Sequence, residues 1–241
     1  PSAVGATLQP LLRRLVDELE DPVLGLPGVG GKQHGLVTLA CVPTAAFYFL
    51  PQAIERFGAR YPEIRFRILD MSANGALEAV ARGEAEFGIN LIGVSHPELS
   101  FTPLADDPFV LACRRDHPLA RRRKIAWNDL EGHRLIGVSR TSGNRMILDA
   151  ALANTGVRLN FVYTVNHLST SLGLVERGLG ASVLPKLATP PRDHPLIVSK
   201  LIEGPRIHRT IGLVERRAGR LSPPAQRFRD MLRAMWPERR A

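Results

Sequence analysis

Residues 36–69, LVTLACVPTAAFYFLPQAIERFGARYPEIRFRIL, decide the fold class, because two apolar stretches flank one segment with helical spacing. LVTLA (36–40) and IRFRIL (64–69) are typical of strands. The segment between them predicts a helix from Pro43 to about Arg60. The apolar side chains spaced for its buried face are Phe47, Leu50, Ile54 and Phe57. A strand, a helix and a strand in this order indicate parallel strands joined by a right-handed crossover.

The same alternation completes a first α/β unit. Asn74 is a good N-cap for a helix that ends at Arg82, and Gly83 suits the position after that helix. FGINLI (87–92) follows as a third strand. Strands and helices that alternate over such short distances predict one parallel sheet.

A second α/β unit begins after Pro118. Its expected strands are RLIGV (134–138), FVYTV (161–165) and ASVLP (181–185), and its expected helices run from about Ser142 to Asn154 and from Ser169 to Arg177. Two further strands, PFVLACR (108–114) and RTIGLVE (209–215), stand at the seams between the units. A last helix has Ser222 as N-cap and Pro223 in its first turn.

The stretch before the first strand is of another kind. A leucine stripe at helical spacing predicts an amphipathic helix from about Gln9 to Asp21. The stripe consists of Leu8, Leu11, Leu12, Leu15 and Leu19. Residues 22–35, PVLGLPGVGGKQHG, are typical of a flexible joint. The stripe either packs on the following domain or meets another chain, and we expect a dimer or larger assembly.

Length and composition exclude several classes of protein. With 241 residues, 44% of them hydrophobic, the chain can bury a core without disulfides. No run of eighteen apolar residues is present, so we expect no membrane-spanning helix. Neither a basic nor an apolar export segment is visible at the start, which favours a cytoplasmic location. Cys41 and Cys113 lie in apolar stretches and are expected to be buried.

The basic charge is concentrated in the second half of the chain. The sequence carries a formal net charge of +9, and residues 121–241 contain 22 basic and 9 acidic residues. No aromatic side chains are interleaved with this charge for stacking on bases. Any association with nucleic acid by this part should therefore be weak and salt-dependent. Solvated surfaces or a cleft that faces an anion explain the charge better.

Motifs for catalysis and cofactor binding fail on their spacing. The glycine-rich joint lacks the first glycine and the final Ser or Thr of a phosphate loop. Gly178 and Gly180 follow an expected helix, the reverse of a dinucleotide fingerprint. The sequence has neither HExxH nor GxSxG, and its histidines never stand at ligand spacing. Asp106 and Asp107 are interpreted as turn and cap residues. We therefore expect no enzyme, no catalytic residue, no metal and no cofactor.

Polar residues stand where strands end and helices begin. In open α/β sheets ligands bind at this edge, and helix N-termini favour anions. Each of these residues alone is explained as a helix cap, but together they predict a cleft between the units. The candidate binding residues are Thr44, Ser72, Thr141, Ser142, Asn144, Asn166 and His167. Because Arg140 and Arg145 would add positive charge, we expect the ligand to be a small organic anion.

Six segments in register make the chain similar to the C-terminal part of LysR-type transcriptional regulators. SAVGATLQPLLRRLVDELED (2–21) resembles the end of the winged-helix domain and the linker helix, and residues 35–68 resemble the opening of the effector-binding domain. LEAVARGEAEFGI (77–89) matches a family segment, with Glu86 and Phe87 where Asp and Leu are usual. DDPFVLACRRDHPLA, KIAWNDLEGHRLI and SLGLVERGLGASVLP complete the set.

The resemblance implies an α/β, two-lobed, periplasmic-binding-protein-like (type 2) fold with two crossing hinge strands, preceded by a linker helix. It assigns residues 1–35 to the linker helix and joint, 36–113 with 213–241 to lobe I, and 114–212 to lobe II. The implied function is effector sensing, in which a small molecule in the cleft rearranges a homo-oligomer and so controls transcription. DNA would be bound through an N-terminal domain of which at most residues 1–6 are present. A transport solute-binding protein with the same fold, which would need export, is the alternative.

Overall fold

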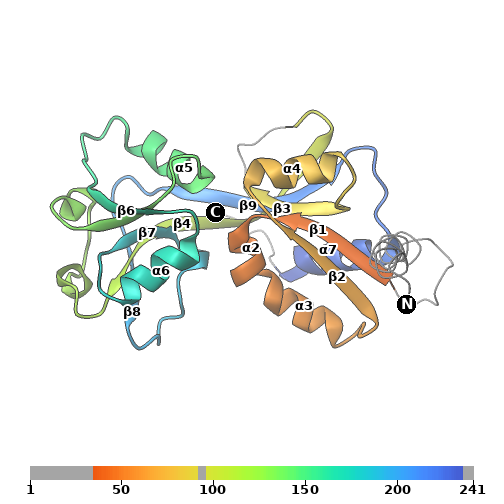
Figure 1. The fold of residues 1–241 in the computed structure, drawn as a ribbon, viewed down its shortest axis with the longest axis horizontal. Coiled ribbons are helices and arrows are strands. Elements are labelled where there is room, and N and C mark those ends of the chain that lie inside the picture. The colour runs from red at the N-terminus through yellow and green to blue at the C-terminus, as the bar shows by residue number, and fades with distance from the viewer. Residues whose placement is uncertain (1–34, 92–95, 236–241) are drawn as a thin grey trace, which may run out of the picture.

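The computed structural model describes residues 35–91 and 96–235. The predicted linker helix and the joint up to His34 lie outside the described residues. The described chain forms two α/β lobes side by side, joined by two long strands (Figure 1). The expected two-lobed fold is confirmed.

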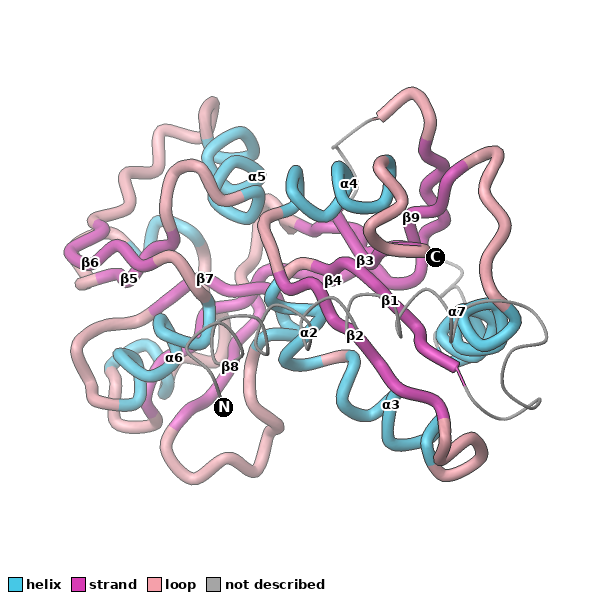
Figure 2. Tube along the Cα trace, turned by 45° about the vertical axis from the view of Figure 1, so that its right-hand side comes forward, coloured by secondary structure: helices cyan, strands magenta, loops and turns pink. Residues whose placement is uncertain are grey.

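Lobe I is built on a parallel sheet. Its first elements are β1 (Gly35–Cys41), α2 (Pro43–Tyr48), α3 (Leu50–Gly58), β2 (Ile64–Asp70), α4 (Ala73–Ala81) and β3 (Phe87–Leu91). β1 pairs in parallel with both β2 and β3, as the alternation of strands and helices predicts. Helix α4 covers one face of the sheet, and α3 and α7 (Pro223–Met235) cover the other (Figures 1 and 2).

Lobe II is also built from alternating strands and helices, but it combines parallel and antiparallel strand pairs. Its elements are the short helices η1 (Pro118–Arg121), η2 (Trp127–Leu130) and η3 (Lys186–Ala188), the helices α5 (Gly143–Leu152) and α6 (Leu168–Glu176), and the strands β5 (Leu135–Val138), β6 (Phe161–Val165), β7 (Ser182–Pro185) and β8 (Ile197–Leu201). β5 and β6 pair in parallel, whereas β7 and β8 pair antiparallel with the far half of β4. Strand β8 is absent from the sequence prediction, since Ser199 and Lys200 interrupt its short apolar run.

The lobes are joined by β4 (Leu99–Arg114) and β9 (His208–Arg216), which run antiparallel to each other. The register of this pair shifts between Pro103 and Ala105. Opposite the shift lies Gly212, where a Cβ atom would approach the carbonyl oxygen of Thr102 to 2.4 Å. Only glycine lets the two backbones come this close.

Each lobe has an apolar core of its own. The core of lobe I includes Leu104 and Ile211, and that of lobe II includes Phe109 and Ile207. The chain therefore passes from one core to the other twice, at residues 105–108 and 208–210. The lobe bounds 36–113 with 213–241 and 114–212 stay a prediction.

The first helical segment differs from its prediction. It forms two helices that meet at Phe49, because Pro51 has no N–H to continue the bonds of the first. Phe47, predicted on the buried face, is 66% exposed. Helix α4 also differs: its N-cap is Ser72, whose Oγ accepts from the N–H of Gly75 at 3.2 Å, and the predicted cap Asn74 lies inside the helix.

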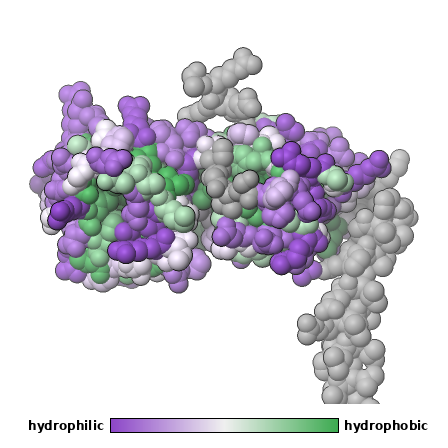
Figure 3. All heavy atoms as spheres, turned by 90° about the horizontal axis from the view of Figure 1, so that it is seen from above, coloured by the Kyte–Doolittle hydropathy of each residue, from purple (hydrophilic) through white to green (hydrophobic). Residues whose placement is uncertain are grey.

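On the face drawn in Figure 3, hydrophilic and apolar side chains are interspersed over both lobes. The large apolar side chains that stay exposed are Phe47, Ile68, Met146, Val162, Leu179, Leu187, Leu196 and Leu201. Within residues 35–91 and 96–235, no helix combines the length and the apolar character needed to cross a membrane.

Candidate functional site

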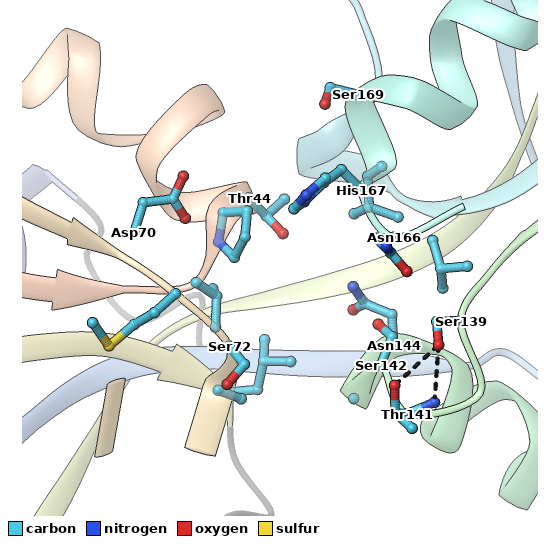
Figure 4. Close-up of a pocket in the computed structure, with 18 of the residues that line it drawn as sticks. Thr44, Asp70, Ser72, Ser139, Thr141, Ser142, Asn144, Asn166, His167 and Ser169 are labelled. Atoms are coloured by element: carbon cyan, nitrogen blue, oxygen red, sulfur yellow. Dashed lines mark hydrogen bonds between the residues drawn. The ribbon is translucent and has the colours of Figure 1, made fainter. Parts of the chain in front are cut away.

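A cavity of about 750 Å³ lies where the strand ends of the two lobes face each other (Figure 4). Lobe I lines it with α2 and the start of α4, and lobe II lines it with the starts of α5 and α6. All seven candidate residues named from the sequence line this one cavity: Thr44, Ser72, Thr141, Ser142, Asn144, Asn166 and His167. Tertiary structure therefore brings together residues that lie up to 123 positions apart (167 − 44).

Thr44 and Ser72 are held at the edge of lobe I by helix starts. Thr44 follows Pro43 directly after β1, and its side chain is buried. Ser72 caps α4, as described above. On the neighbouring strand β3, the buried amide of Asn90 donates to the carbonyl of Ala73 at 2.7 Å and accepts from the N–H of Leu91 at 2.8 Å. The hydrogen bond to Ala73 fixes the start of α4 relative to β3.

On the side of lobe II, a short loop presents hydroxyl groups to the cavity. The hydroxyls of Ser139 and Thr141 are hydrogen-bonded at 3.0 Å (Figure 4). Ser142 is the N-cap of α5, but its side chain makes no capping bond. The first N–H groups of a helix have no partner inside the helix, so this helix start offers donors to a ligand.

Asn166 and His167 lie at the start of α6, and both are exposed. The carbonyl of His167 accepts from the N–H of Ser171 at 3.2 Å, whereas its imidazole makes no capping bond. The next residue, Leu168, is buried in the core of lobe II. This anchor holds the two polar side chains at the edge of the cavity.

The expected positive charge is not where the sequence suggested. The Nε atom of Arg145 bonds Asp149 at 2.7 Å, and its guanidinium lies 4.0 Å above the centre of the Phe161 ring. Neither Arg145 nor Arg140 lines the cavity. Arg145 is held by a partner on the same helix and by an aromatic ring, so its guanidinium is not among the groups that line the cavity. Of the described residues that line the cavity, Asp70 is the one with a carboxylate.

A buried ion pair lies behind the cavity, at the crossing of the two joining strands. Asp107 on β4 and Arg209 on β9 are 1% and 2% exposed, and Nε of Arg209 donates to Oδ2 of Asp107 at 2.9 Å. The other oxygen of Asp107 accepts from the N–H of Leu187 at 2.9 Å. Burial raises the pKa of Asp107 and lowers the pKa of Arg209, while each charge opposes the shift of the other.

The interpretation of Asp107 as a turn or cap residue is therefore wrong. It lies inside the long strand β4, which begins at Leu99, well before the predicted start of that strand. Asp106 is exposed and lies 3.1 Å from the ring Nδ1 of His208. Sequence reasoning also missed Arg209. The available signal was a charged residue at the start of an apolar strand on a predicted seam.

Both cysteines are fully buried, as predicted, and each belongs to a different core. Burial raises the pKa of Cys41 to about 12 and that of Cys113 to about 11. Such thiols are poor nucleophiles and poor metal ligands. In the part of the chain that the structure describes, no three His, Cys, Asp or Glu side chains gather as a metal site.

Comparison with known proteins defines the class of protein. The model of the LysR substrate binding domain matches residues 30–237, so the chain belongs to the LysR-type transcriptional regulators. The HTH-type transcriptional regulator YbhD of Escherichia coli is 44% identical over 234 residues, which cover 97% of this chain and 74% of YbhD. The regulator YfeR of Shigella flexneri is 33% identical over 230 residues, covering 95% and 74%.

Solved structures show the same fold. The effector-binding domain of QuiR in complex with shikimate has a TM-score of 0.73 and 21% identity, covering 86% of this chain and all of that domain. The CcmR regulatory domain of Synechocystis in complex with 2-PG has a TM-score of 0.74 and 24% identity, with coverage of 86% and 100%. The chain is thus the effector-binding, regulatory part of a transcriptional regulator.

Proposed function

We propose that this regulatory domain senses a small organic anion held by the seven candidate residues of the cleft. The observation that carries the proposal is the cavity between the lobes, which these polar side chains line from both sides. A ligand that touches both lobes changes their preferred spacing, and through it the assembly that controls transcription.

Backbone and hydroxyl donors support an anionic ligand in place of the arginines expected from the sequence. The start of α5 supplies free N–H groups, and Ser139, Thr141 and Ser142 supply hydroxyls beside it. Asp70 lies on the opposite, lobe I side of the cavity (Figure 4). The ligand class that suits both sides is a carboxylic acid with a hydroxyl or ammonium group at its other end.

We further propose that the domain catalyses no reaction and works in the cytoplasm, where its DNA target lies. The described residues that line the cavity contain no nucleophile paired with a base. Related proteins are named as transcriptional regulators, which disfavours the transport alternative. DNA contact would belong to a separate, N-terminal domain.

Thr44→Val and Ser142→Ala should each weaken binding by about 1 to 3 kcal/mol, because each leaves a polar group of the ligand unmatched. A thermal-shift screen of small organic carboxylates first finds a ligand, and titration calorimetry then compares the variants. Thr170→Val, an exposed change on α6 outside the cavity lining, is the control. Unchanged affinity in both variants, or a screen in which no carboxylate raises the melting temperature, would contradict the proposal.

The chain should self-associate. The leucines at positions 8, 11, 12, 15 and 19 lie outside the described residues, and their spacing predicts an apolar stripe that a second copy would bury. Sedimentation velocity at tens of micromolar should give a dimer or larger species, and Leu11→Glu combined with Leu15→Glu should shift the protein towards monomer. If the unmodified protein sediments as a monomer, this part of the proposal is wrong.

A further inference from the structure

One nitrogen of the buried Arg209 joins side chains from both lobes. Its Nη1 donates to Oδ1 of Asn144, on α5 of lobe II, at 2.9 Å. The same atom donates to Oγ1 of Thr44, on α2 of lobe I, at 3.4 Å. Thr44 and Asn144 both line the cleft, and the side chain of Arg209 has no exposed surface.

The rest of the guanidinium is fixed to the crossing strands. Nε donates to Asp107, and Nη2 lies 2.8 Å from the same carboxylate oxygen. The angle at Nη2 is too poor for a hydrogen bond, so that contact contributes as an ion pair only. Asp107 in turn accepts a hydrogen bond from the N–H of Leu187, in the short helix η3 that follows β7. The pair thus ties the strand crossing to a third segment of lobe II.

We propose that Arg209 is a positioning residue that sets the spacing of the two lobes across the cleft. A planar guanidinium with two hydrogens on Nη1 can hold Thr44 and Asn144 at the same time, while its Nε faces Asp107. The arrangement places two ligand-facing groups at a fixed separation before any ligand arrives. A ligand that draws on either group competes with Arg209 for it, and so changes the link between the lobes.

The inference rests on the proposed function only for its consequence on ligand binding. The spacing of the lobes can be measured in the protein alone. If no carboxylate binds, the proposed function fails, while the role of Arg209 in lobe spacing remains testable. If the lobe spacing does not depend on Arg209, the inference fails, while carboxylate binding remains testable.

Spin labels at Gln52→Cys on α3 and Thr170→Cys on α6, both exposed positions, report the distance between the lobes. The native cysteines are buried and stay unlabelled in the folded chain. Labelled protein is diluted with unlabelled chain, so that only distances within one chain are seen. Pulsed electron paramagnetic resonance should show a broader distance distribution, shifted to longer values, in Arg209→Lys without any added ligand.

Asn144→Ala provides a second variant that keeps the ion pair intact, and it should broaden the distribution in the same direction. Arg216→Lys is the matched control, since Arg216 lies on the same strand and its Nη1 donates to the carbonyls of Val80 and Ala85 within lobe I. Its distribution should equal that of the unmodified protein. For a carboxylate found in the screen, Arg209→Lys should bind about 10- to 100-fold more weakly. Distributions unchanged in both Arg209→Lys and Asn144→Ala would overturn the inference.

Discussion

Arg209→Met is expected to lower the free energy of unfolding by about 3 to 5 kcal/mol, because it leaves the carboxylate of Asp107 buried without its charged partner. The two hydrogen bonds to Thr44 and Asn144 are lost with it. Urea unfolding followed by circular dichroism measures the change.

The matched control is the double variant Asp107→Leu with Arg209→Met. Replacing both charges with apolar side chains of similar volume should restore most of the lost stability, since no unpaired charge remains. Recovery will be incomplete, because the N–H of Leu187 loses its acceptor. A single variant as stable as the unmodified protein would mean that the pair contributes nothing.

The loss of unfolding free energy in Arg209→Met should also depend on pH. Burial raises the pKa of Asp107, and without Arg209 only the hydrogen bond from the N–H of Leu187 still opposes that shift. A carboxyl with a raised folded-state pKa favours folding at low pH, and this contribution is lost as the pH rises through that pKa. The stability difference between Arg209→Met and the unmodified protein should therefore shrink as the pH is lowered from neutral.

Phe228→Ala should cost about 3 to 5 kcal/mol in unfolding free energy, because it removes the centre of an aromatic cluster in lobe I. The Phe228 ring lies 5.1 Å from that of Phe57 and 4.7 Å from that of Phe66, centre to centre, and it is fully buried. Together with Ala225 and Leu232, it packs α7 into the core of lobe I.

Phe47→Ala makes the same chemical change at an exposed site. With 66% of its surface already in water, it should alter stability by less than about 1 kcal/mol. Equal losses for Phe228→Ala and Phe47→Ala in the same urea experiment would refute the assignment of the core. A change in ligand affinity alone is compatible with the position of Phe47 at the cavity.

The sequence by itself determined the order and type of most elements. The short apolar stretch LVTLA and the helical spacing in residues 50–58 are local signals, since each depends on neighbours within a few positions. Proline and glycine marked the ends just as locally: Pro223 opens α7, and Gly83 and Gly178 follow their helices with φ of 77° and 75°. Because parallel strands end at one edge of the sheet, the seven polar candidates could also be named from the sequence.

Only the tertiary structure decided which charged side chains contact each other. Arg209 meets Asp107 across 102 positions and Thr44 across 165, and no local pattern reports contacts at such separations. The place of Arg145 near a helix start predicts charge at the cleft, yet its guanidinium bonds Asp149, packs over the Phe161 ring and does not line the cavity. The partners of a side chain depend on which segments fold against it. The periodicity of the sequence predicts only the face of the helix or strand on which that side chain lies. For that reason the position of the cleft was predictable, and the ion pair behind it was not.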